Sequence, residues 1–126
     1  MPDKESSHSR GPRWECWDVR VAPGKHEDYM DFLATVWRDA MEFGKRRGDI
    51  LSYHVLSVNQ PRNGEPDLVL AVCFKDYQSI ADREKYDKEL AAHLGSGARQ
   101  IERDAGERTA LRTILGSIEY QELLLK

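Results

Sequence analysis

The sequence lacks the features that define several large classes of protein. No apolar stretch approaches the roughly 20 residues that a membrane-spanning helix needs, so no membrane association is expected. No basic stripe interleaved with aromatic residues is present and the net charge is -3, so nucleic acid is not an expected partner. The two cysteines both lie in apolar segments, which favours a reducing, cytoplasmic location over a disulfide framework.

Sequence motifs for metals and phosphates are also missing. The chain contains no His-x-His, HExxH or Cys-x-x-Cys spacing. Gly95-Ser96-Gly97 has neither the preceding strand nor the following lysine of a phosphate-binding loop. His54, Cys73 and an acidic residue are the right ligand types for zinc, but their spacing does not support a site. We therefore expect neither a metal nor a cofactor.

The first twelve residues, MPDKESSHSRGP, are polar and have no hydrophobic centre. This composition indicates a disordered leader over residues 1–12 rather than a secretory signal. The remaining residues, 13–126, are enough for one domain with its own core, and we expect a single domain there.

A strand, a tight corner and an amphipathic helix follow in succession from Arg13 to Gly48. Alternation in the strand predicts one face with Trp17, Val19 and Val21 and another with Trp14, Cys16, Asp18 and Arg20. Ala22-Pro23-Gly24-Lys25 ends the strand. Apolar residues then recur at helical spacing, with Glu27 and Asp28 in the first turn and Gly48 as the stop. The apolar stripe comprises Tyr29, Phe32, Leu33, Val36, Trp37, Ala40 and Met41.

Two further strands are predicted at Ile50 to Val58 and Leu68 to Phe74, joined by a loop that contains Asn63-Gly64. A turn at Asn63-Gly64 would set Val58 opposite Val69, Leu56 opposite Ala71 and His54 opposite Cys73. Pro61 and Pro66 allow a wider loop, which could slip the register by one residue and reverse the faces.

The rest of the chain predicts a helix in two parts and a final strand. Asp76 is the expected cap of a helix from about Tyr77 to Leu94. Ser96 is the expected cap of a second part that reaches Leu115 and stops at Gly116, with a weak point at Gly106. The last strand is predicted at Ile118 to Leu125.

This order predicts an α+β fold, a ferredoxin-like βαββαβ with a four-stranded antiparallel sheet. From Arg13 to Lys126 it resembles the dimeric α+β barrel superfamily, which includes antibiotic-biosynthesis monooxygenase domains, EthD-like proteins and NIPSNAP-like proteins. The opening WDVRVAPGKHEDYMDFL is similar to the first strand, Pro-Gly corner and helix start of that superfamily. The resemblance implies a homodimer in which two sheets pack face to face.

The second sheet face supports the same expectation on physical grounds. It is too apolar to remain in water, and the leader is too polar to cover it. The alternative is a monomer in which the charged second helix or the leader folds over this face. The residues expected on the face are Trp14, Cys16, Leu56, Val58, Val69, Ala71 and Cys73.

The candidate chemistry lies on that same face. The resemblance to the monooxygenases implies a cofactor-independent oxygenase or isomerase that binds an apolar or aromatic compound between sheet and helices. In that reading His54 is the catalytic base, Arg20 stabilises an anion and Asp18 orients it. Trp14, Cys73, Glu122 and His26 are the further residues expected to bind the substrate.

The alternative reading is a non-catalytic binding or assembly module. Asp18 and Arg20 would then form a structural ion pair, His54 would be a hydrogen-bonded strand residue, and the same face would finish a dimer core. An enclosed and partly polar cavity facing His54 would favour the enzyme, whereas dense packing there would favour the module.

Overall fold

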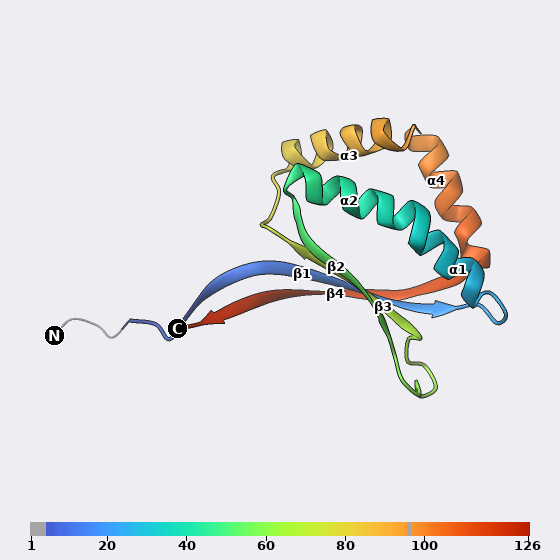
Figure 1. The fold of residues 1–126 in the computed structure, drawn as a ribbon, viewed down its shortest axis with the longest axis horizontal. Helices are drawn as coiled ribbons and strands as arrows, with labels where there is room; N and C mark the ends of the chain where they lie inside the picture. Colours follow the sequence, from blue (N-terminus) through green and yellow to red (C-terminus); the bar gives the residue numbers. More distant parts are fainter. Residues whose placement is uncertain (1–4, 96) are drawn as a thin grey trace.

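The secondary-structure elements follow the predicted order of strand, helix, strand, strand, helix, strand (Figure 1). The computed structural model describes residues 5–95 and 97–126. The second helix is split in two, as predicted. The elements are β1 (His8–Val21), α1 (His26–Phe32), the π-helix η1 (Leu33–Trp37), α2 (Arg38–Arg47), β2 (Ile50–Ser57), β3 (Leu68–Phe74), α3 (Ile80–Leu94), α4 (Ala98–Glu107), the 3₁₀-helix η2 (Arg108–Ala110) and β4 (Arg112–Leu125).

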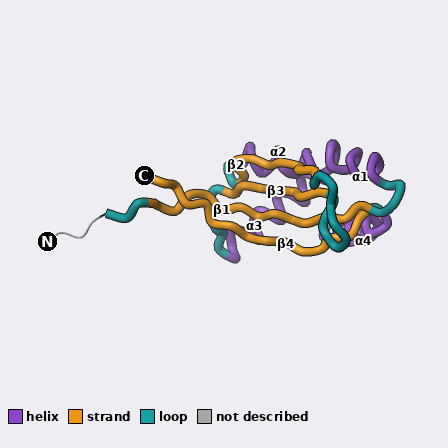
Figure 2. Tube along the Cα trace, turned by 90° about the horizontal axis from the view of Figure 1, so that it is seen from below, coloured by secondary structure: helices purple, strands orange, loops and turns teal. Residues whose placement is uncertain are grey.

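The four strands form one antiparallel sheet in the order β2-β3-β1-β4. All the helices lie on one face of this sheet, and the other face is open (Figure 2). The helix α2 covers the β2 side of the sheet, while α3 and α4 lie toward the β4 side (Figure 2). This is the predicted α+β, ferredoxin-like arrangement.

The core lies between the sheet and the first helix. Val19, Tyr29 and Leu33 are each at most 3% exposed, and they pack with Leu68 and Leu70 of β3. Trp17 and Val21 pack against this cluster from the same side of β1, which confirms the predicted alternation. Burying each large apolar side chain contributes about 1.5–3 kcal/mol, so this layer contact is the main stabilising feature.

The first helix begins and ends where the sequence predicts. Glu27 and Asp28 occupy its first turn, and Gly48 ends it with a φ of 91°. The π-helix Leu33–Trp37 in its middle was not predicted. A π turn is wider than an α turn, so it rotates the residues that follow out of a 3.6-residue stripe. Val36, expected in the buried stripe, is 48% exposed.

The predicted register between β2 and β3 is wrong by two residues. His54 pairs with Ala71 and Leu56 with Val69, whereas we expected Cys73 and Ala71. The turn forms at Asn63-Gly64, because the Glu65 amide donates to the Arg62 carbonyl. The Val58 amide donates to the Asp67 carbonyl, so the loop holds three residues, 59–61, on the β2 side and only Pro66 on the β3 side. This difference of two residues shifts the register. A slip of two residues preserves the face, so the predicted set of open-face residues survives.

The last third of the chain departs most from the predictions. The helix α3 begins at Ile80 and is capped by Ser79 rather than Asp76. Ser96, the expected cap of the next helix, lies outside the described residues. Ile114 and Leu115 belong to β4 instead of a helix, and Gly116 is not a helix stop. It lies at a bulge between the pairs Asp18–Gly116 and Val19–Ile114, which leaves Leu115 as the extra residue.

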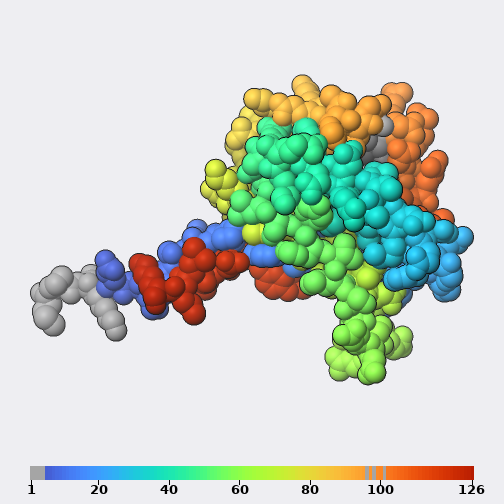
Figure 3. Space-filling view, viewed as in Figure 1, coloured from blue at the N-terminus to red at the C-terminus, as the bar shows by residue number. Residues whose placement is uncertain are grey.

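The strand β1 begins at His8, so residues 8–12 belong to the sheet and not to the expected disordered leader. His8, Ser9 and Arg10 pair with Leu125, Leu124 and Leu123 at the end of β4. These two strand ends form an arm that projects beyond the helical layer (Figures 1 and 3). The three leucines on it are 44–85% exposed.

Candidate functional site

Four of the predicted site residues gather on the open face of the sheet. The Trp14 and His54 rings stack with centroids 6.0 Å apart and planes inclined by 20°. The Trp14 indole Nε1 donates a hydrogen bond to Glu122 Oε1 at 2.8 Å. Cys73 pairs with Trp14 across β1 and β3, which places its thiol in the same group. Although the β2–β3 register differs from the predicted one by two residues, His54 still lies in this cluster.

The two thiols on this face are poorly suited to act as nucleophiles. Burial raises the pKa of Cys73, and the nearby Glu122 carboxylate raises it further, against a smaller opposing effect of a hydrogen bond from Ser52. Burial and the Asp18 carboxylate raise the pKa of Cys16. Each thiol is thus held in its protonated and less reactive form at neutral pH.

The other three predicted site residues do not join the cluster. The Arg20 guanidinium donates to the Glu65 carbonyl in the β2–β3 loop at 3.4 Å. Within the described part of the chain, no ion pair joins Arg20 to Asp18. His26 is exposed and begins α1. The structure therefore does not bring a base, its orienter and an anion-stabilising group together on the open face.

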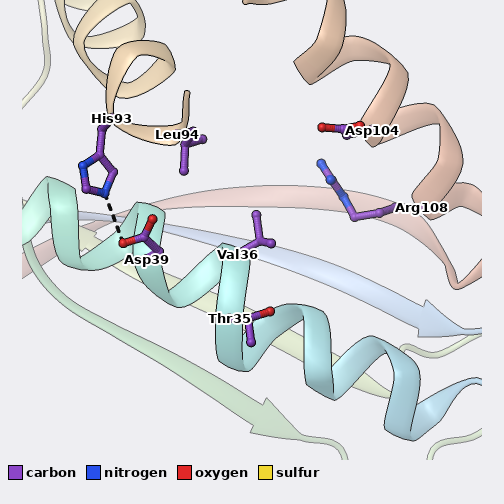
Figure 4. Close-up of a pocket in the computed structure, with 7 residues that line it drawn as sticks. All are labelled: Thr35, Val36, Asp39, His93, Leu94, Asp104 and Arg108. Atoms are coloured by element: carbon purple, nitrogen blue, oxygen red, sulfur yellow. Dashed lines mark hydrogen bonds and ion pairs between the residues drawn. The ribbon is translucent and has the colours of Figure 1, made fainter. Parts of the chain in front are cut away.

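A cavity of about 400 Å³ lies on the opposite side of the sheet, between the first helix and the α3–α4 pair (Figure 4). We call it the helical pocket. Its walls combine two acidic side chains, one imidazole, one guanidinium and three side chains that supply apolar surface. The lining residues are Thr35, Val36, Asp39, His93, Leu94, Asp104 and Arg108.

One wall of the helical pocket is an imidazole–carboxylate pair. His93 Nε2 and Asp39 Oδ1 lie 3.1 Å apart and join α3 to α2. The imidazole also stacks on the Phe43 ring, with centroids 4.9 Å apart. The other ring nitrogen of His93 points away from Leu94 and Arg108 (Figure 4). This pair therefore fixes the distance between the two helices and does not present a free nitrogen to the cavity.

The opposite wall places Asp104 and Arg108 side by side, with both side chains pointing into the cavity (Figure 4). The Asp104 Oδ1 atom accepts a hydrogen bond from Gln100 at 2.8 Å. The Arg108 guanidinium lies over the Phe32 ring, 4.5 Å from its centroid, which is a cation–π contact. Burial and the neighbouring Arg112 lower the pKa of Arg108, an effect that Asp104 partly opposes.

Sequence reasoning missed this pocket for two reasons. Its residues come from helices that are far apart in the chain, and no short motif relates Asp39 to His93 or Asp104. Thr35 and Val36 reach it from the π-helix, which carries no glycine or proline that would have indicated it. π turns are frequent at functional sites because they re-aim side chains, and here the turn exposes Val36 to the cavity.

The described residues form neither a metal-binding cluster nor a membrane-spanning helix. In residues 5–95 and 97–126, no group of three or more His, Cys, Asp or Glu side chains is arranged to hold a metal ion. None of the described helices has both the length and the apolar character to cross a membrane.

Comparison with known proteins supports the fold and leaves the function open. No protein-family model and no curated protein matches the sequence. The chain is similar to the crystal structure of HapK from Hahella chejuensis, with 8% identity and a TM-score of 0.56 over 87% of this chain and 91% of HapK. PA3566 from Pseudomonas aeruginosa aligns with 16% identity and a TM-score of 0.47 over 92% of this chain and 96% of PA3566. At such identity, the likeness to HapK shows a shared small α+β fold with an antiparallel sheet.

Proposed function

We propose that the protein binds a small apolar or aromatic molecule in the helical pocket. The observation that carries the proposal is the cavity itself, because about 400 Å³ falls within the range of small-molecule sites. Its chemistry supports the same reading. Val36 and Leu94 offer apolar surface, and Asp104 and Arg108 converge from one side to orient a ligand.

The open face has a different role in this proposal, as the contact between two copies of the chain. Leu56, Ile118 and Tyr120 lie on it and are each about half exposed, although they are large and apolar. Exposed leucines also follow on the projecting arm, at the end of β4. Large exposed apolar surfaces on soluble proteins usually mark interfaces, and a two-fold contact uses the same face on each copy.

His54, first expected to be catalytic, and Trp14 and Glu122, expected to bind the substrate, then belong to the dimer contact. Trp14, His54 and Glu122 are already linked by stacking and a hydrogen bond, which is how a specific interface is ordered. This favours the assembly role for the open face over the enzymatic one. The monooxygenase- or isomerase-like activity, which the sequence placed on His54, Arg20 and Asp18, stays a prediction. In the helical pocket, Asp104 is the carboxylate that would face a bound molecule (Figure 4).

A thermal-shift screen tests the binding proposal. We would compare wild type with Val36→Glu, which places a charge on the pocket wall, and with Leu51→Glu as a matched control. Leu51 is as exposed as Val36 but does not line the pocket. The screen would contain phenols, quinols and naphthols, since a ligand that binds the folded state raises the melting temperature.

The expected result is that aromatic compounds stabilise wild type and Leu51→Glu by several degrees but have no effect on Val36→Glu. Oxygen consumption in the same mixtures would test for oxygenase activity. The proposal fails if no compound stabilises wild type, or if Val36→Glu responds as wild type does.

A further inference from the structure

Two neighbouring arginines, Arg108 in the wall of the helical pocket and Arg112 behind it, have no acidic partner in the described part of the chain. Arg108 begins η2 and Arg112 begins β4, four residues later. The Nε atoms of both are buried without a hydrogen-bond partner. Among the described residues, neither guanidinium has a carboxylate within 4.0 Å.

Every other arginine that is buried to a similar degree in the described chain is paired. Arg13 lies beside Glu15 and Glu119, and Arg47 lies beside Asp49 and Glu89. The Tyr29 hydroxyl contacts Arg112 but carries no charge to balance it. A guanidinium without a counter-charge that has lost part of its hydration is costly, and two such groups close together also repel one another. The nearest carboxylate in the pocket, Asp104, is engaged by Gln100 instead. A buried donor without a partner calls for an explanation, and an anionic ligand would supply one.

The charges around the cavity restrict what kind of anion fits. Asp39 and Asp104 contribute two negative charges that would repel a dianion such as a phosphate monoester. The Phe32 ring covers the face of the Arg108 guanidinium, which leaves the edge of the guanidinium for a planar, two-oxygen partner. A single carboxylate meets both conditions.

We propose that the helical pocket takes an aromatic or apolar molecule with one carboxylate, which Arg108 binds and the positive charge of the neighbouring Arg112 attracts. This inference rests on the proposed function and specifies its ligand class. The apolar body of the ligand lies against Val36 and Leu94, on the cavity walls beyond Arg108. Arg108 orients the ligand at the cavity wall, and Arg112 supplies the second positive charge behind it.

The test is a nuclear magnetic resonance titration of the full chain with benzoate and, separately, with benzamide. The two probes have the same ring and shape but differ in charge. The signals followed are the arginine Nε–H groups and the methyl groups of Val36 and Leu94. Arg108→Gln and Arg112→Gln assign the arginine signals, with Arg103→Gln as the control on an exposed arginine of α4. If a variant fails to fold, the arginine signals of wild type are assigned by through-bond experiments instead.

The expected result is that benzoate moves the Nε–H signals of Arg108 and Arg112 together with the Val36 methyls, with a Kd at least fivefold below that of benzamide. Arg108→Gln should abolish this preference, and Arg103→Gln should keep it. Equal binding of both probes, with the arginine signals unmoved, would overturn the carboxylate assignment and leave the proposed function standing. No movement of the Val36 or Leu94 methyls with either probe would overturn both.

Discussion

Arg13 is a buried arginine that lies between two glutamates, Glu15 and Glu119. It is 6% exposed, and its guanidinium lies 4.4 Å from the Phe74 ring centroid and 4.9 Å from that of Tyr77. Its Nη1 atom also lies 3.1 Å from Glu119 Oε1 and contacts Glu15. Glu15 and Glu119 are direct cross-strand partners in β1 and β4, so Arg13 separates two like charges.

We predict that Arg13→Met destabilises the protein by about 2 kcal/mol. Methionine keeps the packing on the two rings but leaves Glu15 and Glu119 facing one another without a counter-charge. Chemical denaturation would measure the loss. Adding Glu119→Gln to Arg13→Met should restore about 0.5–1 kcal/mol, because it removes the repulsion. Strictly additive effects of the two substitutions would show that Arg13 acts through packing alone.

The helix α2 approaches the sheet closely at Gly44. A Cβ atom added there would lie 2.4 Å from Ile50 Cδ1 and 2.8 Å from Ile50 Cγ1. Ile50 is 3% exposed, so it cannot move aside into solvent. Glycine at this position lets α2 pack directly onto the start of β2, which in turn sets where the first helix lies relative to the sheet.

We predict that Gly44→Ala costs about 1–3 kcal/mol of unfolding free energy, despite the better helix propensity of alanine. Gly106→Ala is the matched control, because Gly106 lies in α4 and a Cβ there would meet nothing within 4 Å. That substitution should instead stabilise the protein by about 0.5 kcal/mol. Thermal unfolding would measure both, and a stabilising Gly44→Ala would contradict the close approach.

The elements also show where sequence reasoning succeeded and where it failed. The first strand and helix were predictable because alternation, the Pro-Gly corner and Gly48 all point to the same boundaries. The second half was harder because Ile114 and Leu115 fit either a helix or a strand, and pairing with β1 decides between them. The β2–β3 register depends on an asymmetric loop, in which residues 59–61 lie on the β2 side opposite one residue on the β3 side. Gln60, in this segment, has a φ of 54°. No local pattern specifies that.

In our proposal, the two faces of the sheet have separate roles across the molecule. The sequence predicted the composition of the open face but assigned the chemistry to it, because His54, Cys73 and Glu122 are reactive residue types on strands. The helical pocket depends on how α2, α3 and α4 are spaced over the sheet. That spacing is a tertiary property, so Asp39, His93 and Arg108 could not be grouped from the sequence.

The dimer proposal makes a prediction at this scale. Light scattering should give the mass of two chains for wild type and of one chain for Ile118→Glu, since two charges would be buried at a two-fold contact. Ile80→Glu is the control, because Ile80 is even more exposed but lies at the start of α3 on the helical layer. A wild-type protein with the mass of one chain, or an Ile118→Glu variant that still dimerises, would contradict the open face as the contact.

We propose that the ligand site lies among the helices and not on the open face of the sheet. A methyl-resolved nuclear magnetic resonance titration with 2-naphthol tests it most directly, because both surfaces carry methyl groups that report on contact. We predict that the methyl signals of Val36 and Leu94 move, while those of Leu56 and Ile118 stay in place. Movement confined to Leu56 and Ile118, or no movement at Val36 and Leu94, would contradict the claim.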